Sequence, residues 1–334
     1  MQKQFVDTLI IGSGCAGFNT ADWLYDLGRR DIAIVTEGVS SGTSRNTGSD
    51  KQTYYKLSLS GKEPDSVYDM AETLFSGGAV HGDLALCEAA GSVKSFIKLC
   101  NLGVPFPTNE YGEYAGYKTD HDPRQRATTA GPLTSKYMTE CLERSVRSKG
   151  IKIIDQIRIV KLLVEDGTVY GALGTDTKTG AFLVIYANNV VLATGGAAGV
   201  YYNTVYPESQ IGALGLAING GAVLENLAEW QYGIASIKFR WNVSGTYQQV
   251  LPRYVAVDGE GNEREFLIEY FEDPKKALDK VFLKGYQWPF DSAKVDGSSS
   301  IDIMIDKEIK KGNRIYMDFT KNPKGLEEFD GLSA

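Results

Sequence analysis

The chain has 334 residues, 43% hydrophobic and 23% charged, which suits a globular protein long enough for two domains. Its 42 acidic and 35 basic residues give a net charge of −7, which argues against nucleic acid or an anionic membrane surface as a partner. Because no apolar run is long enough to span a bilayer and the first expected strand begins close to Met1, we expect a cytoplasmic protein without a signal peptide.

The stretch from Val6 to Gly38 has the pattern of a strand, a glycine-rich turn, a helix and a second strand. The turn reads Gly12-Ser13-Gly14-Cys15-Ala16-Gly17. Gly12 allows a tight turn, Gly14 lets a pyrophosphate approach the backbone, and Gly17 lets helix and strand lie close together. The start of the helix adds free N–H groups and a positive dipole end. The sequence therefore predicts a dinucleotide-binding site.

The end of the second strand and the loop after it add further candidates. Glu37 is the acidic residue expected to bind the ribose, although Thr36 is an alternative for the same position. The following loop is rich in Gly, Ser and Thr, so it is either a plain connection or a second wall of the cofactor site. Beside a dinucleotide motif we favour the second interpretation. The residues concerned are Gly38, Thr43, Ser44, Arg45, Asn46, Thr47 and Gly48.

Helices are expected at 65–76, 83–101 and 133–149, and the second should bury Leu86, Ala90, Val93, Ile97 and Cys100. From residue 151 the hydrophobic residues follow a period of two, as in a strand. This pattern predicts an antiparallel meander over 151–186, with a hairpin turn at Asp166-Gly167. A separate, fully buried strand is expected at 189–193. It ends in a second glycine turn at the sheet edge where ligands bind. This edge adds Ala193, Thr194, Gly195 and Gly196 to the cofactor-binding candidates, and Ile159 of the meander is included with them.

The composition changes near residue 236, which predicts domains at 1–235 and 236–334. In the second, strands are expected at 254–257, 265–268 and 315–319, and helices at 274–284 and 299–310. The four cysteines form no C-x-x-C pair, and the two histidines, His81 and His121, are far apart, so no metal or iron–sulfur site is expected. His121 lies in a polar loop and is a candidate to face a substrate.

Several of these motifs together resemble a known family. GSGCAG at 12–17, ATGG at 193–196 and LENLAEWQY at 224–232 are similar to the flavoprotein family of succinate dehydrogenase, fumarate reductase and L-aspartate oxidase. The stretch KFRWNVSGTYQQVLPRY at 238–254 resembles FAD-binding oxidoreductases of anaerobes within that family. The resemblance implies FAD rather than NAD. It also implies an α/β Rossmann-like FAD-binding domain with an inserted antiparallel β-meander, followed by an α+β capping domain.

The sequence departs from the family's pattern at several sites. Where the family has the histidine that bonds covalently to flavin, Arg45 follows Ser44, which implies non-covalent FAD. The family's Gln-Phe-His-Pro-Thr-Gly is replaced by the residues at 231–236, and Ile303 aligns with its proton-donating arginine. An aliphatic side chain cannot donate a proton or clamp a carboxylate, so fumarate and succinate are not expected substrates.

The chain ends at Ala334, whereas the family's chain returns to the FAD domain. The resemblance therefore implies a fragment, a truncated product or one half of a split protein. Its exposed sheet edge and apolar face would then be covered by a partner chain or a second copy.

Two classes of function follow. The first is an FAD-dependent oxidoreductase that acts on a small, anionic substrate and exchanges electrons with a partner protein. Its substrate-facing candidates are Gln231, Tyr232, Thr246 and Gln248; Tyr247 could donate a proton, and Arg240 and Arg253 could bind an anionic group. The second is a non-catalytic or electron-transfer subunit whose site another chain completes. An NAD-dependent reductase is a third alternative.

Overall fold

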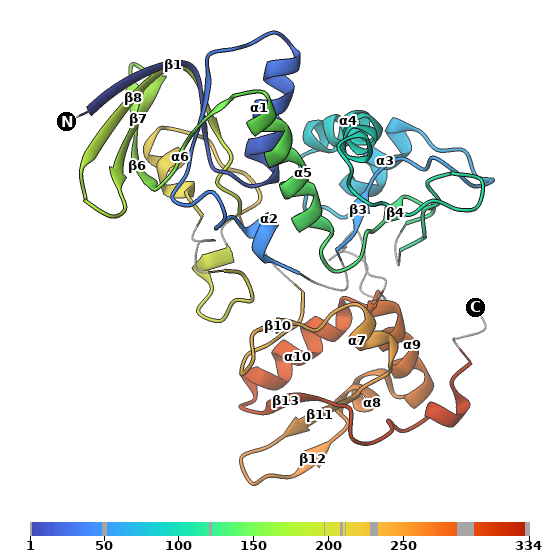
Figure 1. Cartoon of the computed structure of the whole chain (residues 1–334). Helices are drawn as coiled ribbons and strands as arrows, with labels where there is room; N and C mark the ends of the chain where they lie inside the picture. The colour runs from blue at the N-terminus through green and yellow to red at the C-terminus, as the bar shows by residue number, and fades with distance from the viewer. Residues whose placement is uncertain are drawn as a thin grey trace. The chain divides into compact units, whose positions relative to one another are not determined.

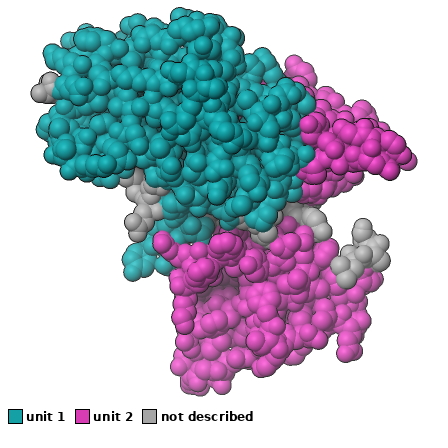
Figure 2. Space-filling model, viewed as in Figure 1, with its two compact units in different colours: residues 1–52, 94–106, 129–232 teal, residues 53–93, 107–128, 233–334 magenta. Residues whose placement is uncertain are grey.

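The computed structural model describes residues 2–48, 52–119, 122–196, 198–207, 210, 212–227, 233–285 and 297–330 (Figure 1). The chain forms two compact units (Figure 2). Unit 1 comprises residues 1–52, 94–106 and 129–232, and unit 2 comprises 53–93, 107–128 and 233–334. The last division, at 232/233, lies close to the expected boundary at 236, whereas the inclusion of 53–93 and 107–128 in unit 2 was not expected. The functional boundary between an FAD domain and a cap stays a prediction.

A six-stranded mixed sheet forms the centre of unit 1, in the order β5-β2-β1-β8-β7-β6. Four neighbouring strands are parallel: β5 (Lys152–Ile154), β2 (Ile32–Val35), β1 (Gln2–Ile11) and β8 (Phe182–Leu192). The other two, β7 (Thr168–Asp176) and β6 (Ile157–Glu165), extend the sheet antiparallel. Asp166 and Gly167 turn between them with positive φ angles of 47° and 74°, as a two-residue hairpin requires. The predicted meander is confirmed from Ile157 on, whereas its expected first part, at 151–156, is wrong: Lys152–Ile154 form β5, which pairs parallel with β2 at the opposite edge of the sheet.

Strand β8 corrects two expectations. The strands expected at 182–186 and 189–193 are one continuous strand, because Gln2 to Ile11 of β1 pair along all of it, from Leu183 to Leu192. Its polar middle is tolerated because the Asn188 amide donates to the Asp7 carboxylate over 3.1 Å. The end of the strand is not fully buried, since Leu192 is 36% exposed.

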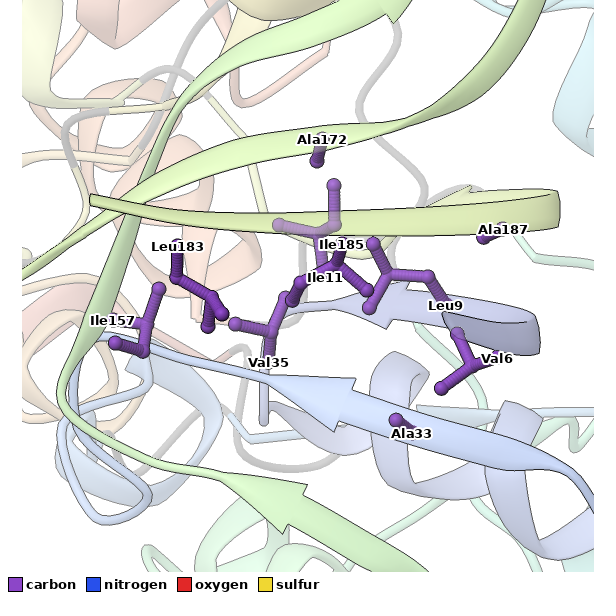
Figure 3. Packing of buried hydrophobic residues seen from close by; sticks show 10 residues of the cluster. All are labelled: Val6, Leu9, Ile11, Ala33, Val35, Ile157, Ala172, Leu183, Ile185 and Ala187. Atoms are coloured by element: carbon purple, nitrogen blue, oxygen red, sulfur yellow. The ribbon is translucent and has the colours of Figure 1, made fainter. Parts of the chain in front are cut away.

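Helices pack against both the parallel and the antiparallel part of this sheet (Figure 1). Helix α1 (Cys15–Asp26) contacts β1 and β2, α5 (Thr134–Ser148) lies beside α1, and the short α6 (Leu214–Asn219) contacts β6. Buried side chains from five strands meet in one cluster (Figure 3), formed by Val6, Leu9, Ile11, Ala33, Val35, Ile157, Ala172, Leu183, Ile185 and Ala187. The strand–glycine turn–helix–strand unit is therefore held on a packed sheet.

Helix α4 (Gly82–Asn101) buries a different face from the expected one. Its buried residues are Ala85, Ala89, Ser92, Phe96 and Leu99, whereas Leu86 and Ile97 are 36% and 38% exposed. Both sets have helical spacing and differ by a shift of one residue. The large ring of Phe96, which packs on Phe106 with centroids 4.7 Å apart, fixes the buried face.

Unit 2 combines small antiparallel sheets with helices. Strands β12 (Glu263–Arg264), β11 (Arg253–Val257) and β13 (Arg314–Asp318) form one sheet, and helices α8 (Phe266–Phe271), α9 (Pro274–Lys284) and α10 (Ser300–Lys310) pack with it. Shorter elements are β3 (Tyr54–Tyr55), β4 (Ala127–Thr128), α3 (Val67–Phe75), β9 (Ala235–Ser236), β10 (Trp241–Asn242) and α7 (Thr246–Gln249). The expected α/β fold with a following α+β region is confirmed.

One strand expected in this unit is wrong. Residues 266–268 belong to helix α8 instead of a strand, and only Glu263 and Arg264 before them pair with β11. The three-residue apolar run Phe266 to Ile268 is too short to reveal its period, so the packing of the buried Phe266 ring against Tyr254 decides the conformation.

Two searches of the described residues gave no result. No helix among them combines the length and the apolar character needed to cross a bilayer. Within the same residues, no three His, Cys, Asp or Glu side chains are grouped as a metal site.

Candidate functional site

The turn after β1 is built by backbone contacts that exclude side chains. Gly12 has φ +113°, and a Cβ atom there would lie 2.3 Å from the carbonyl oxygen of Ala193. A Cβ at Gly17 would lie 2.0 Å from the carbonyl oxygen of Gly12. Both distances are far inside van der Waals contact, so glycine is required at both positions. The first turn of α1 is thereby held against the ends of β1 and β8.

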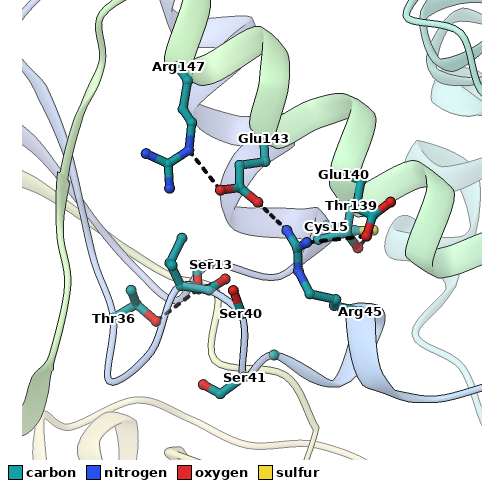
Figure 4. Close-up of polar contacts among 12 residues, drawn as sticks. Ser13, Cys15, Thr36, Ser40, Ser41, Arg45, Thr139, Glu140, Glu143 and Arg147 are labelled. Atoms are coloured by element: carbon teal, nitrogen blue, oxygen red, sulfur yellow. Dashed lines mark hydrogen bonds and ion pairs between the residues drawn. The ribbon is translucent and has the colours of Figure 1, made fainter.

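Hydroxyl groups line the turn from the neighbouring loops. The Ser13 and Thr36 hydroxyls form a 2.8 Å hydrogen bond (Figure 4). The backbone N–H of Cys15 donates to the Ser44 hydroxyl over 3.4 Å. A Cβ at Gly14 would lie 3.3 Å from that Ser44 oxygen. The expected second wall therefore does approach the glycine turn, through the short helix α2 (Thr43–Asn46).

A cavity of about 490 Å³ opens along this surface within unit 1. Thirteen predicted cofactor-binding residues line it: Gly12, Ser13, Gly14, Cys15, Ala16, Thr36, Glu37, Thr43, Ser44, Ile159, Ala193, Thr194 and Gly195. Residues that the sequence did not indicate complete the wall, among them Gly42, Ile157, Arg158, Gln210, Gly212 and Asn219. The cavity combines a helix N-terminus, glycines without side chains and hydroxyl groups, which fits the diphosphate of a dinucleotide.

The acidic residue at the end of β2 has a basic partner. Arg158 of β6 donates from Nε and Nη2 to the two carboxylate oxygens of Glu37 over 3.0 and 3.2 Å. Both residues line the cavity. Thr36 also lines it, but its hydroxyl is bonded to Ser13. The Glu37 carboxylate thus lies at the cavity wall, and the choice between Glu37 and Thr36 for ribose binding stays a prediction. Arg158 was missed because no local pattern connects it to Glu37.

Gln210 is a second residue that the sequence analysis missed. Its buried side chain accepts a hydrogen bond from the Thr43 hydroxyl and donates to the carbonyl oxygen of Gly196 over 2.9 Å. It thus connects the α2 loop to the glycine turn after β8. No local pattern in the sequence marks Gln210, which stands between Ser209 and Ile211.

Seven predicted cofactor-binding residues are not among the lining residues: Gly17, Gly38, Arg45, Asn46, Thr47, Gly48 and Gly196. Arg45 forms ion pairs with Glu140 and Glu143 of α5 instead (Figure 4). The Asn46 amide donates to the carbonyl oxygens of Ser40 and Gly42 over 2.7 and 3.0 Å. These side chains shape the loop, and a direct role in cofactor binding stays a prediction.

Cys15 lines the cavity, but its thiol is turned into the fold. Its sulfur lies 2.9 Å from the Thr139 hydroxyl. Burial raises the pKa of the Cys15 thiol, an effect that hydrogen bonds to Thr139 and Ser44 oppose only in part. A protonated, buried thiol is a poor nucleophile, so the environment favours a structural role over a redox role.

The candidate catalytic and substrate residues that are described lie in unit 2. Arg253 pairs with Asp318 at 2.7 Å and with Glu263 at 3.0 Å. Gln248 is buried and accepts from the Tyr254 hydroxyl over 2.6 Å, while its amide donates to the carbonyl oxygen of Val243. These contacts favour structural roles for both residues.

Three further candidates also belong to unit 2. Tyr247 is partly exposed and packs edge-on against Phe319. Thr246 begins helix α7, and Arg240 lies in the turn between β9 and β10. Gln231, Tyr232 and His121 lie outside the described residues.

Fold and site together define a dinucleotide-binding flavoprotein architecture, and comparison with known proteins makes it specific. A family model described as "FAD binding domain" matches residues 7–327. The chain belongs to this family, and its cofactor is FAD. The expected resemblance to succinate dehydrogenase, fumarate reductase and L-aspartate oxidase is confirmed.

Individual relatives support the assignment. The chain is 28% identical over 229 residues to an L-aspartate oxidase of Agrobacterium fabrum, covering 67% of this chain and 42% of the relative. It is 26% identical over 239 residues to an uncharacterized FAD-dependent oxidoreductase of Methanocaldococcus jannaschii, covering 68% and 41%. The chain thus matches less than half the length of these two relatives. A structure of Escherichia coli quinol fumarate reductase shares the fold, with a TM-score of 0.73, 18% identity and coverage of 98% of this chain and 56% of that one.

Proposed function

We propose that the chain is an FAD-dependent oxidoreductase that holds its flavin non-covalently and acts on a small, anionic substrate. The observation that carries the proposal is the 490 Å³ cavity, lined by the glycine turn, the start of α1 and Glu37. When bound, FAD supplies hydride or electron transfer at its ring system. The family to which the chain belongs supports this assignment.

The roles of the residues follow from their chemistry. Backbone N–H groups at the start of α1 bind and orient the diphosphate, because they have no partners within the helix. Glu37 accepts hydrogen bonds from the ribose hydroxyls. The hydroxyls of Thr43 and Ser44 extend this polar wall from the neighbouring loop.

The absence of a covalent bond to flavin is inferred from the loop after β2. Arg45 follows Ser44 where the family's attachment histidine would stand, and a guanidinium does not form such a bond. Its pairing with Glu140 and Glu143 also directs it toward α5. The flavin is therefore expected to be released when the protein unfolds.

The proposal for the substrate is less specific than the proposal for the cofactor. Arg240 and Arg253 stay the proposed anion-binding groups and Tyr247 the proposed proton donor, and the ion pair of Arg253 with Asp318 favours a structural role for that residue. Ile303 is a half-exposed aliphatic residue on α10, which supports the exclusion of fumarate and succinate.

The visible spectrum of the purified chain tests this function. We expect flavin absorption bands, and after acid precipitation the yellow colour should move to the supernatant. Colour that stays with the precipitate would contradict non-covalent binding. A colourless protein that also fails to bind added FAD would contradict the function for this chain.

A second candidate is a flavoprotein subunit that needs a partner chain. It is favoured by a row of aromatic rings across the sheet, in which Phe5 stacks on Tyr186 at 5.0 Å and Tyr186 lies 6.4 Å from Tyr170. Phe5 is 73% exposed, and such apolar patches are typical of interfaces. Light scattering on the FAD-loaded protein, with and without co-expressed candidate subunits, separates the two. A monomer whose flavin is reduced and reoxidised alone would exclude this candidate.

A further inference from the structure

The ion pair between Glu37 and Arg158 joins two segments that are 121 residues apart in sequence. Backbone hydrogen bonds hold these segments together: Ile157 N–H donates to the carbonyl oxygen of Thr36 over 2.9 Å, and Thr36 N–H donates to that of Ile154 over 3.0 Å. The pair is therefore placed by the sheet itself at the mouth of the nucleotide cavity.

Stability does not explain this pair well. The Arg158 side chain is 57% exposed and that of Glu37 is 39% exposed. Exposed ion pairs contribute at most about 1 kcal/mol to folding. Both residues, however, line the cavity, so their interaction bears on whatever occupies it.

The hydrogen-bond capacity of the carboxylate indicates what that interaction does. An ionised carboxylate offers about four lone-pair sites. The two donors of Arg158 occupy one site on each oxygen. The fork fixes the plane of the carboxylate and leaves one further site on each oxygen for an incoming donor. Two neighbouring ribose hydroxyls have matching donors.

We infer that Arg158 is a positioning residue that orients Glu37 toward the ribose of the adenosine half of the cofactor. This inference rests on the proposed function. It assigns recognition at this end of the cavity to an adenosine diphosphate group with free ribose hydroxyls. Arg158 acts through Glu37, so its loss weakens binding only while the Glu37 carboxylate is present.

Five variants test the inference: R158Q, R158K, E37Q, the double variant of R158Q with E37Q, and R147Q as a matched control. Arg147 forms an exposed pair with Glu143 in the same unit and does not line the cavity. FAD affinity is measured by quenching of flavin fluorescence, and ADP affinity by calorimetry.

We expect R158Q to weaken FAD and ADP binding by the same factor, about fivefold, which is the size expected for one ordinary hydrogen bond. E37Q should weaken both by about tenfold or more. The double variant should bind as E37Q does, because the coupling is then lost. R158K should lie between wild type and R158Q, since lysine cannot form the two-pronged contact. R147Q should match wild type.

Other outcomes distinguish a failure of the Arg158 inference from a failure of the proposed function. If wild type binds FAD but R158Q binds it equally well, the inference fails and the proposed function stands. Additive losses in the double variant would show that Arg158 acts independently of Glu37, which also overturns it. A wild-type chain that binds neither FAD nor ADP would overturn both.

Discussion

In unit 1, the hydroxyl and carboxylate groups of Ser13, Thr36 and Glu37 lie along an open cavity. In unit 2, the charged groups around Arg126 and Glu308 are bonded to one another. Arg126 is fully buried and contacts both carboxylate oxygens of Asp65, over 2.9 and 2.7 Å, and Asp122 over 3.2 Å. The comparison shows that polar groups serve two purposes here. One set faces a site for a ligand, and the other set stabilises the fold.

Removing Arg126 gives the largest expected effect. R126M leaves the carboxylates of Asp65 and Asp122 buried without their cation, so we expect unit 2 to lose about 3–5 kcal/mol of stability. Urea unfolding followed by circular dichroism measures this loss. R124Q is the control, because Arg124 pairs with the exposed Glu63 at 3.6 Å and should cost less than about 1 kcal/mol. Equal midpoints for the two variants would contradict the structural role of the buried cluster.

The next largest effect is expected from a substitution in the glycine turn, which should weaken FAD binding. A Cβ at Gly17 would lie 2.0 Å from the Gly12 carbonyl oxygen. Overpacking of this kind costs about 1–3 kcal/mol, so G17A should weaken FAD binding by roughly 10- to 100-fold. In the control G91A, the new methyl group meets no atom within 4 Å, and binding should be unchanged. Fluorescence titration with FAD decides between them, and equal affinities would show that the turn is not a close contact.

Lowering the pH should have a smaller effect than these substitutions, and the effect should be on the stability of unit 2. Burial raises the pKa of Glu308, but hydrogen bonds from Lys311, Arg264, Asn313 and Tyr270 outweigh it and hold the pKa at about 2, below the ordinary 4.5. A depressed pKa in the folded state gives stability that is present above about pH 4.5 and is lost as the pH falls toward 2. The wild type should therefore lose stability more steeply over this range than E308Q.

The matched control for this prediction lies on the same helix. Asp306 is exposed and pairs with Lys310 at 2.6 Å. D306N should follow the wild-type pH profile, as measured by urea midpoints between pH 5 and pH 2. If E308Q and D306N gave the same profile as wild type, Glu308 would not carry the acid sensitivity.

The elements that the sequence predicted are those set by local constraints. The strand, glycine turn, helix and second strand at 6–38 follow from short-range pattern, and so does the hairpin at Asp166-Gly167. Helices α9 and α10 and strand β13 were found for the same reason. The thirteen lining residues that were expected lie almost all in these turns or at strand ends.

The predictions that were wrong or missed depend on contacts between segments that are distant in sequence. Arg158 pairs with Glu37, which is 121 residues away in sequence, and Arg45 pairs with Glu143, which is 98 residues away. Neither partner can be predicted from a short stretch of sequence. Strand β8 is continuous because it pairs with β1 along its length, whereas the sequence alone predicted two separate strands there. For α4, two faces had equal spacing, and the packing of Phe96 on Phe106 selected one.

The pairing of β1 with β8 also has a consequence for the time course of folding. Gln2 of β1 pairs with Leu183 of β8. Because β8 is synthesised much later than β1, β1 has no partner on that edge until then. At about 5–20 residues per second, this delay is on the order of 10–40 s. Throughout that interval one edge of β1 is open to other chains. The nascent protein is therefore most vulnerable to aggregation during synthesis, before the nucleotide cavity exists.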